Sequence, residues 1–109
     1  MYQKEMKEGF IQDYMRSRVV AKTSLYSLFR KTEMFEEKFG KDCSRFTKEE
    51  IVEMYSEFKS KSVYVLMNYN VILKAYCAFL KYYHGLEIQV AYEDMTIDIL
   101  RPLIPDNAN

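Results

Sequence analysis

Residues 62–85, SVYVLMNYNVILKAYCAFLKYYHG, decide the fold of this 109-residue chain. Large side chains recur every three or four residues along the stretch, at Leu66, Tyr69, Leu73, Tyr76, Leu80 and Tyr83, flanked by Asn70 and Cys77. This spacing is typical of a helix that packs on several other helices. Ser62 can cap the first turn, and Gly85 can adopt the left-handed conformation that ends a helix. We therefore expect one long central helix.

Two amphipathic helices are predicted before the central helix. Residues 3–15 carry apolar side chains at helical spacing, at Met6, Phe10, Ile11, Tyr14 and Met15. Thr23 or Ser24 is the expected N-cap of a second helix that ends at Gly40. Its apolar stripe consists of Leu25, Leu28, Phe29, Thr32, Phe35 and Phe39.

A third short helix is predicted to open with a capping box. Thr47 and Glu50 have the spacing at which each side chain can bond the other residue's backbone N–H. Its apolar side chains would be Ile51, Met54, Tyr55 and Phe58. After the central helix we expect an extended segment over residues 86–91 and a last helix over residues 92–100, which Pro102 would end.

The composition favours a single all-α domain. Glycine and proline total five residues, which leaves few turn signals, and 49% of the residues are hydrophobic. We expect a four- to five-helix orthogonal bundle. Residues 1–20 would form a leading helix and basic segment, residues 21–101 the helical domain, and residues 102–109 an interdomain linker or an artificial chain end.

Several classes of site are not indicated. Cys43 and Cys77 have no neighbouring cysteine or histidine that would suggest a metal site or a disulfide framework, so no metal and no cofactor are expected. The first residues are mixed in charge, unlike a secretory signal. The apolar stretch 63–80 is interrupted by Asn68, Asn70 and Lys74, so no membrane partner is expected. A cytoplasmic location follows from these expectations.

The charges are unevenly distributed although the formal net charge is zero. Residues 14–32 contain five basic side chains and no acidic one, and residues 58–86 contain four basic side chains and no acidic one. Clustered cations matter more than total charge for binding a polyanion. Two acid-free basic segments are therefore candidates for one binding surface.

The order of these elements resembles the core-binding (SAM-like, N-terminal) domain of phage integrases and tyrosine recombinases. The resemblance rests on KTSLYSLFRKTEMFEEKFGK (22–41), FTKEEIVEMYSEF (46–58) and KSKSVYVLMNYNVILKAYCAFLKYYHG (59–85). The matching pieces are Thr23–Phe29, Thr47–Ile51, and Ser62 with the block from Leu73 to Leu80. The resemblance implies a DNA-binding domain that clamps one side of the duplex and contacts further protomers in a synaptic assembly. The bacterial or phage-encoded origin is implied in the same way.

The sequence departs from this family in two places. Many members carry Ser/Thr and Arg in the first turns of the long helix, where this chain has Tyr64, Leu66, Asn68 and Tyr69. The family's catalytic Arg, His-x-x-Arg and Tyr set is missing, since the single His84 has no arginine three residues later. We therefore expect a non-catalytic domain, separated from any catalytic domain that would follow it.

Ten residues are predicted to contact duplex DNA: Arg16, Arg18, Lys22, Thr23, Ser27, Arg30, Lys61, Ser62, Tyr64 and Asn68. Cations and hydroxyls suit phosphate oxygens, and an asparagine amide can bond an adenine edge. Thr23, Ser27 and Arg30 share one helix face, and so do Lys61, Tyr64 and Asn68. The hypothesis requires that folding bring both sets into one cationic ridge.

Other interpretations stay open on the sequence. A catalytically inactive, recombinase-like phage regulator would have the same first domain. A helical protein–protein interaction module, with exposed Met and Tyr side chains as its docking surface, would also explain the composition. Glu49, Glu50 and Glu53 are explained by the start of a helix rather than by hydrolytic chemistry, so neither an enzyme nor a small-molecule substrate is indicated.

Overall fold

The computed structural model describes residues 2–105. Within them the chain forms five α-helices and no strand, which confirms the predicted all-α bundle. The helices are α1 (Lys4–Ser17), α2 (Lys22–Phe39), α3 (Lys48–Glu57), α4 (Val63–His84) and α5 (Ile97–Leu100). Three short 3-10 turns, at Cys43–Arg45, Ala91–Asp94 and Arg101–Leu103, complete the regular structure.

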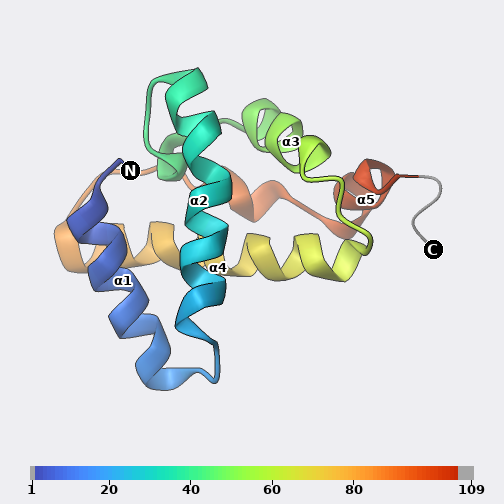
Figure 1. The fold of residues 1–109 in the computed structure, drawn as a ribbon. Helices are drawn as coiled ribbons and strands as arrows, with labels where there is room; N and C mark the ends of the chain where they lie inside the picture. The colour runs from blue at the N-terminus through green and yellow to red at the C-terminus, as the bar shows by residue number, and fades with distance from the viewer. Residues whose placement is uncertain (1, 106–109) are drawn as a thin grey trace.

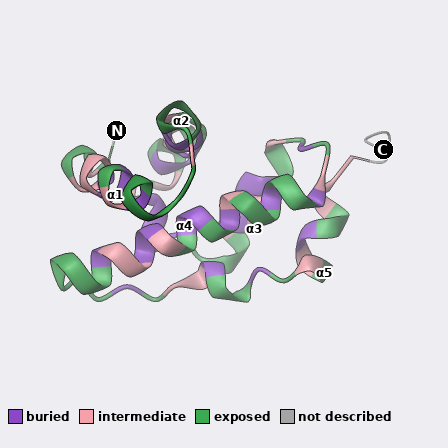
Figure 2. Ribbon diagram, turned by 90° about the horizontal axis from the view of Figure 1, so that it is seen from below, coloured by how far each residue is buried: buried purple, intermediate pink, exposed green. Residues whose placement is uncertain are grey.

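The central helix α4 organises the other elements. Figure 1 shows α2 crossing α4 steeply near its middle, with α1 beside α2 over the later turns of α4. The view from below in Figure 2 places α1 and α2 on one side of α4 and the segment that leads to α5 on the other. The steep crossing agrees with the expected orthogonal arrangement.

Helix α4 begins and ends as its sequence predicts. The Ser62 hydroxyl accepts a hydrogen bond from the Tyr64 N–H, and Gly85 adopts a φ of 63° after the last turn. Eight of its residues are buried: Val63, Leu66, Asn70, Ile72, Leu73, Tyr76, Cys77 and Leu80. Tyr83 is the exception to the predicted seam. It is 70% exposed in the final turn, where its ring lies 5.0 Å from the Phe79 ring, centroid to centroid.

By length and composition alone, α4 could also cross a membrane, with a mean hydropathy of 1.4 over its most apolar window. Core helices of soluble proteins pass the same test. Here the helix carries much of the shared core, and the other elements pack around it.

Two further predicted helix ends are confirmed. The Thr47 hydroxyl accepts a hydrogen bond from the Glu50 N–H, and the Glu50 carboxylate accepts one from the Thr47 N–H, which completes the capping box of α3. Gly40 has a φ of 71°, and its N–H bonds the Glu36 carbonyl at the end of α2. A residue with a β-carbon is strained at that φ.

The start of α2 differs from the prediction. Its N-cap is Ala21, and no side chain caps it, so Thr23 and Ser24 lie inside the first turn. Helix α1 also extends two residues beyond the expected end at Met15, to Ser17. A four-residue connection, residues 18–21, joins the two helices.

The predicted helix over residues 92–100 is wrong. The chain instead forms the 3-10 turn at Ala91–Asp94 and the four-residue helix α5. Tyr92 is buried, its hydroxyl donates to the Cys43 carbonyl at 2.7 Å, and the Asn70 amide donates to the Tyr92 carbonyl at 2.9 Å. These tertiary bonds hold the backbone at Tyr92 out of a continuous helix.

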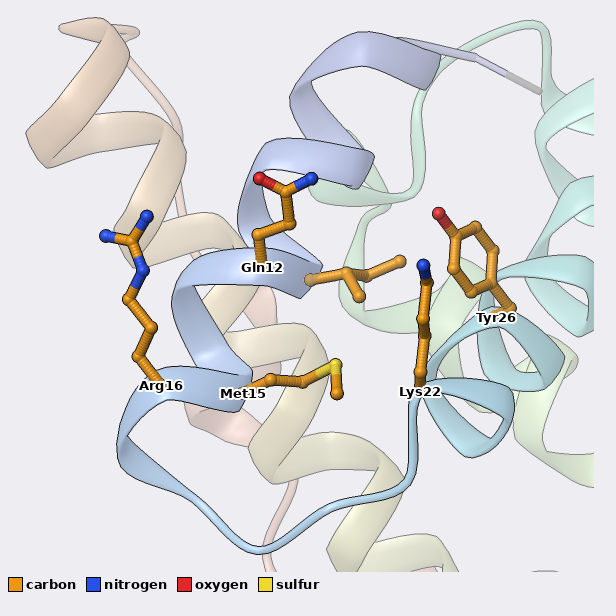
Figure 3. Close-up of a pocket in the computed structure, with 6 residues that line it drawn as sticks. Gln12, Met15, Arg16, Lys22 and Tyr26 are labelled. Atoms are coloured by element: carbon orange, nitrogen blue, oxygen red, sulfur yellow. The ribbon is translucent and has the colours of Figure 1, made fainter.

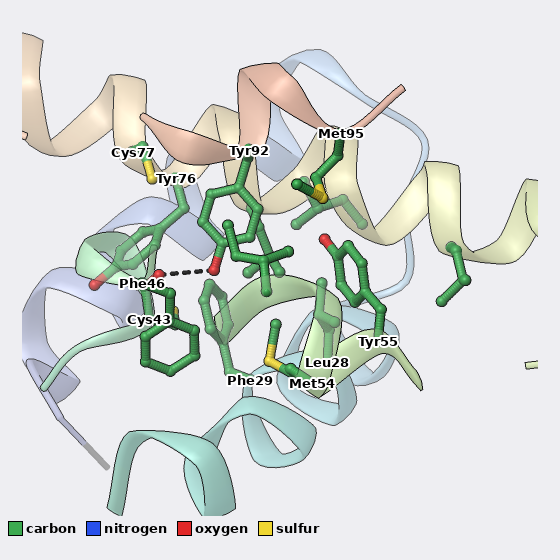
Figure 4. Packing of buried hydrophobic residues seen from close by; sticks show 14 of the residues in the cluster. Leu28, Phe29, Cys43, Phe46, Met54, Tyr55, Tyr76, Cys77, Tyr92 and Met95 are labelled. Carbon is green, nitrogen blue, oxygen red and sulfur yellow. Dashed lines mark hydrogen bonds between the residues drawn. The ribbon is translucent and has the colours of Figure 1, made fainter. Parts of the chain in front are cut away.

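One aromatic-rich core joins the helices (Figure 4). Phe10 of α1, Phe29 of α2 and Tyr76 of α4 contact one another, with ring centroids between 5.2 and 6.1 Å apart. Helix α1 therefore belongs to the same core as α2 and α4. The boundary predicted between residues 20 and 21 falls in the α1–α2 connection, and the predicted linker lies outside the described residues from 106 onward.

Candidate nucleic-acid interface

A surface hollow lies between the first turns of α2 and those of α4. Seven residues line it: Thr23, Ser24, Ser27 and Leu28 from α2, and Val65, Asn68 and Tyr69 from α4. The structure thus places three of the ten predicted contact residues, Thr23, Ser27 and Asn68, around one hollow. Their hydroxyl and amide groups are solvent-exposed and point to a ligand that needs hydrogen bonds rather than only apolar contact.

A second hollow lies on the other side of α2, against α1 (Figure 3). Arg16 and Lys22 stand at its edges, and Gln12 adds an amide. The remaining lining is apolar or aromatic, from Ile11, Met15 and Tyr26. Both hollows border the first turn of α2. Lys22 lines the hollow against α1, and the next residue, Thr23, lines the hollow against α4.

The other five predicted residues line neither of these hollows. The Arg18 guanidinium lies 4.8 Å from the centroid of the Tyr14 ring and donates to the Ser17 hydroxyl. Arg30 is exposed on α2, three residues beyond Ser27. Lys61, Ser62 and Tyr64 gather at the beginning of α4, where Ser62 serves as the cap and Tyr64 is 71% exposed.

Acidic side chains are unevenly distributed around these hollows. None of the residues that line either hollow is acidic. Exposed carboxylates gather on the segment that lies across α4 from α1 and α2, at Glu87, Glu93, Asp94 and Asp98. Acids on the nearer helices are Glu5, Glu8 and Asp13, in α1, and Glu33, Glu36 and Glu37, in the later turns of α2. The surface at the start of α2 and α4 therefore suits an anionic partner.

Two exposed residues that were not predicted to contact DNA complete this surface. Val65 is 40% exposed and stands one turn before Asn68 on α4, and Ser24 stands beside Thr23. Their position could have been found from the helical period, since residues three and four apart share a face. The period alone does not tell which neighbouring helix meets that face.

A separate polar cluster is fully buried between α1, α2 and the turn that follows α2. The Lys7 ammonium lies 2.6 Å from a Glu36 carboxylate oxygen and 3.0 Å from an Asp42 oxygen, and it also donates to the Tyr2 carbonyl. Asp42 further accepts from the Ser44 and Tyr76 hydroxyls, and Glu36 accepts from the Cys43 N–H. This cluster fixes α1 to the rest of the bundle.

The cluster holds two carboxylates and one ammonium. Burial raises the pKa of Glu36 to about 7, although the Lys7 hydrogen bond opposes this shift. Burial and the neighbouring carboxylates also raise the pKa of the Cys43 thiol well above its usual value. Glu36, Asp42 and Cys43 each place a possible metal ligand within 4.8 Å of the others, but the Lys7 ammonium already bonds both carboxylates.

The sequence analysis missed this cluster although a signal was present. Lys7 stands three, four and seven residues before Phe10, Ile11 and Tyr14, which places it on the apolar stripe of α1. Glu36 likewise lies on the stripe of α2 that contains Phe29 and Thr32. A charged residue on a core-facing stripe indicates a buried partner of opposite charge.

Comparisons with known proteins place the chain in a family. Residues 1–81 match the family described as the N-terminal core-binding domain of MrpR. Neither the curated proteins nor the solved structures contain a significant match to the chain. The match spans α1, α2 and α3 and most of α4, which are the elements that build both hollows. Because it covers well over half of the 109 residues, the chain belongs to the family of MrpR N-terminal core-binding domains.

Proposed function

We propose that this domain binds duplex DNA through the surface formed by the first turns of α2 and α4. The observation that carries the proposal is the acid-free hollow between these helices, which has exposed hydroxyl and amide groups in its lining. Cations stand near it along the chain, at Lys22 before Thr23 and at Lys61 before α4. Phosphates meet such cations and hydroxyls, whereas bases meet the amide.

The cations supply the affinity in this proposal. Five of the predicted contact residues are basic: Arg16, Arg18, Lys22, Arg30 and Lys61. If each neutralised one phosphate, the logarithm of the binding constant would fall with the logarithm of salt concentration with a slope of about −4.5. Affinity would then drop by more than about 100-fold between 50 and 200 mM salt.

A charge-reversal experiment tests the surface. Replacing Arg18, Lys22 and Arg30 together with glutamate should abolish duplex binding at low salt and leave the helical circular dichroism unchanged, because all three side chains are exposed. Fluorescence anisotropy with a labelled random duplex measures the binding. Unchanged affinity in this variant would refute the proposed surface.

The matched control reverses three exposed cations elsewhere. Arg45, Lys48 and Arg101 lie on the turn after α2, on α3 and on the turn after α5. Both triple variants change the net charge from zero to −6, since each replacement changes it by two. The control variant should keep most of its affinity. An equal loss in both would mean that total charge, and not this surface, governs binding.

We propose further that this chain is the DNA-clamping, non-catalytic half of a phage-type integrase or site-specific recombinase. The whole protein would be bacterial or phage-encoded and cytoplasmic. The resemblance of residues 22–85 to that family supports this assignment. Contacts with further protomers in a synaptic assembly are part of the same proposal. A catalytically inactive, recombinase-like regulator is the alternative. The gene beyond Asn109 separates the two, since only a recombinase would encode the Arg, His-x-x-Arg and Tyr set.

A further inference from the structure

The hollow between α2 and α4 has a lining that differs from its surroundings. No charged side chain lines it. Val65 adds exposed apolar surface beside the Asn68 amide, and Thr23 and Ser27 add hydroxyls from the opposite helix. A neutral, partly apolar lining, with Lys22 and Lys61 close to it along the chain, matches the division of a DNA interface into base contacts and phosphate contacts.

Two asparagines of α4 have opposite roles. The Asn70 amide is used inside the fold, where it accepts from the Tyr55 hydroxyl and donates to the Tyr92 carbonyl, both at 2.9 Å. The Asn68 amide is exposed at the hollow and bonds to no other residue of the described chain. Its donor and acceptor are therefore available to a ligand that presents one acceptor and one donor side by side.

The adenine edge in the major groove presents this pair, at N7 and N6. The thymine of the same base pair adds a C5-methyl group, which favours an apolar neighbour. Val65 and Asn68 are three residues apart, so their side chains are neighbours on one helix face. Guanine is read best by arginine or lysine, and neither lines this hollow.

We propose that this hollow reads an A·T base pair in the major groove, with Asn68 on the adenine edge and Val65 on the thymine methyl group. The inference rests on the proposed DNA-binding function and adds the class of base pair that the surface recognises. Thr23 and Ser27 face the same groove from α2 and contact the flanking backbone.

The test begins with selection of duplexes from a random pool by the 109-residue chain at low salt. The enriched duplexes should share at least one invariant A·T pair. Replacing its thymine with deoxyuridine removes only the methyl group and should weaken binding about fourfold. Replacing its adenine with 7-deazaadenine removes the N7 acceptor and should weaken binding about fivefold.

Variants assign each effect to a side chain. Asn68→Ala should bind the adenine and 7-deazaadenine duplexes equally, and Val65→Ala should bind the thymine and deoxyuridine duplexes equally. Val71→Ala is the matched control, because Val71 is 49% exposed on the same helix but does not line the hollow. It should keep both preferences. Exposure of all three side chains favours normal folding, which circular dichroism verifies.

The outcomes separate this inference from the function on which it rests. Absence of any duplex binding at low salt overturns the DNA-binding proposal itself. Duplex binding with invariant G·C pairs, or with no response to deoxyuridine and 7-deazaadenine, overturns the A·T inference alone. If Asn68→Ala still prefers adenine to 7-deazaadenine and Val65→Ala still prefers thymine to deoxyuridine, this hollow does not recognise the base pair.

Discussion

Replacing Glu36 with glutamine should remove much of the pH dependence of this domain's stability between about pH 4.5 and pH 7. Glu36 is fully buried and shares the Lys7 ammonium with Asp42. One of its carboxylate oxygens has no hydrogen-bond partner among the described residues. A proton on that carboxylate would lower the cost of burying two acids beside one base.

The sign follows from the direction of the pKa shift. Burial raises the pKa of Glu36 in the folded state from 4.5 to about 7. The folded state then holds a proton that the unfolded chain has already released in this window, so the free energy of unfolding falls as the pH rises. At about 1.4 kcal/mol for each pKa unit, the loss amounts to at most about 3 kcal/mol between pH 4.5 and pH 7.

Urea unfolding followed by far-ultraviolet circular dichroism at pH 4.5, 5.5, 6.5 and 7.5 measures this loss. Glu36 is one of many ionisable groups in the chain, so the informative quantity is the difference between the wild-type and Glu36→Gln curves. Glu37→Gln is the matched control, because Glu37 is the next residue of α2 and is exposed. Parallel curves for wild type and Glu36→Gln would refute a titrating carboxylate in this cluster.

Three further substitutions probe the fold, each measured by urea or thermal unfolding. Lys7→Met should destabilise the domain by about 3–5 kcal/mol, because two buried carboxylates lose their cation; a loss below about 1 kcal/mol would contradict the buried ion cluster. Thr47→Ala should cost about 1 kcal/mol by removing the capping box, while Ser24→Ala should cost little, since Ser24 caps nothing. Leu73→Ala, at a fully buried position of α4, should cost about 2–5 kcal/mol, and a smaller loss would mean that the core closes around the cavity.

The candidate DNA surface was partly accessible to sequence reasoning. The helical period placed Thr23 with Ser27 on one face of α2, and Tyr64 with Asn68 on one face of α4, because a face depends only on spacing along one helix. Lys61, predicted to share that face, lies before the cap of α4. The meeting of Thr23, Ser27, Val65 and Asn68 around one hollow depends on how α2 crosses α4. The crossing angle is set by side-chain packing between the helices, and it cannot be deduced from the spacing of apolar residues along either helix.

Local chemistry alone determined the all-α class, the long helix from Ser62 to Gly85, the capping box at Thr47 and the end of α2 at Gly40. Each of these depends on residues within a few positions of one another, so the chain carries the full signal. Tertiary contacts decided the rest. Tyr92 is held out of a helix by bonds to Cys43 and Asn70, which are 49 and 22 residues away. Lys7 is buried because Glu36, 29 residues later, meets it in space. The free energy of such bonds exceeds a local helix preference of less than about 1 kcal/mol per residue, so only the folded chain reveals them.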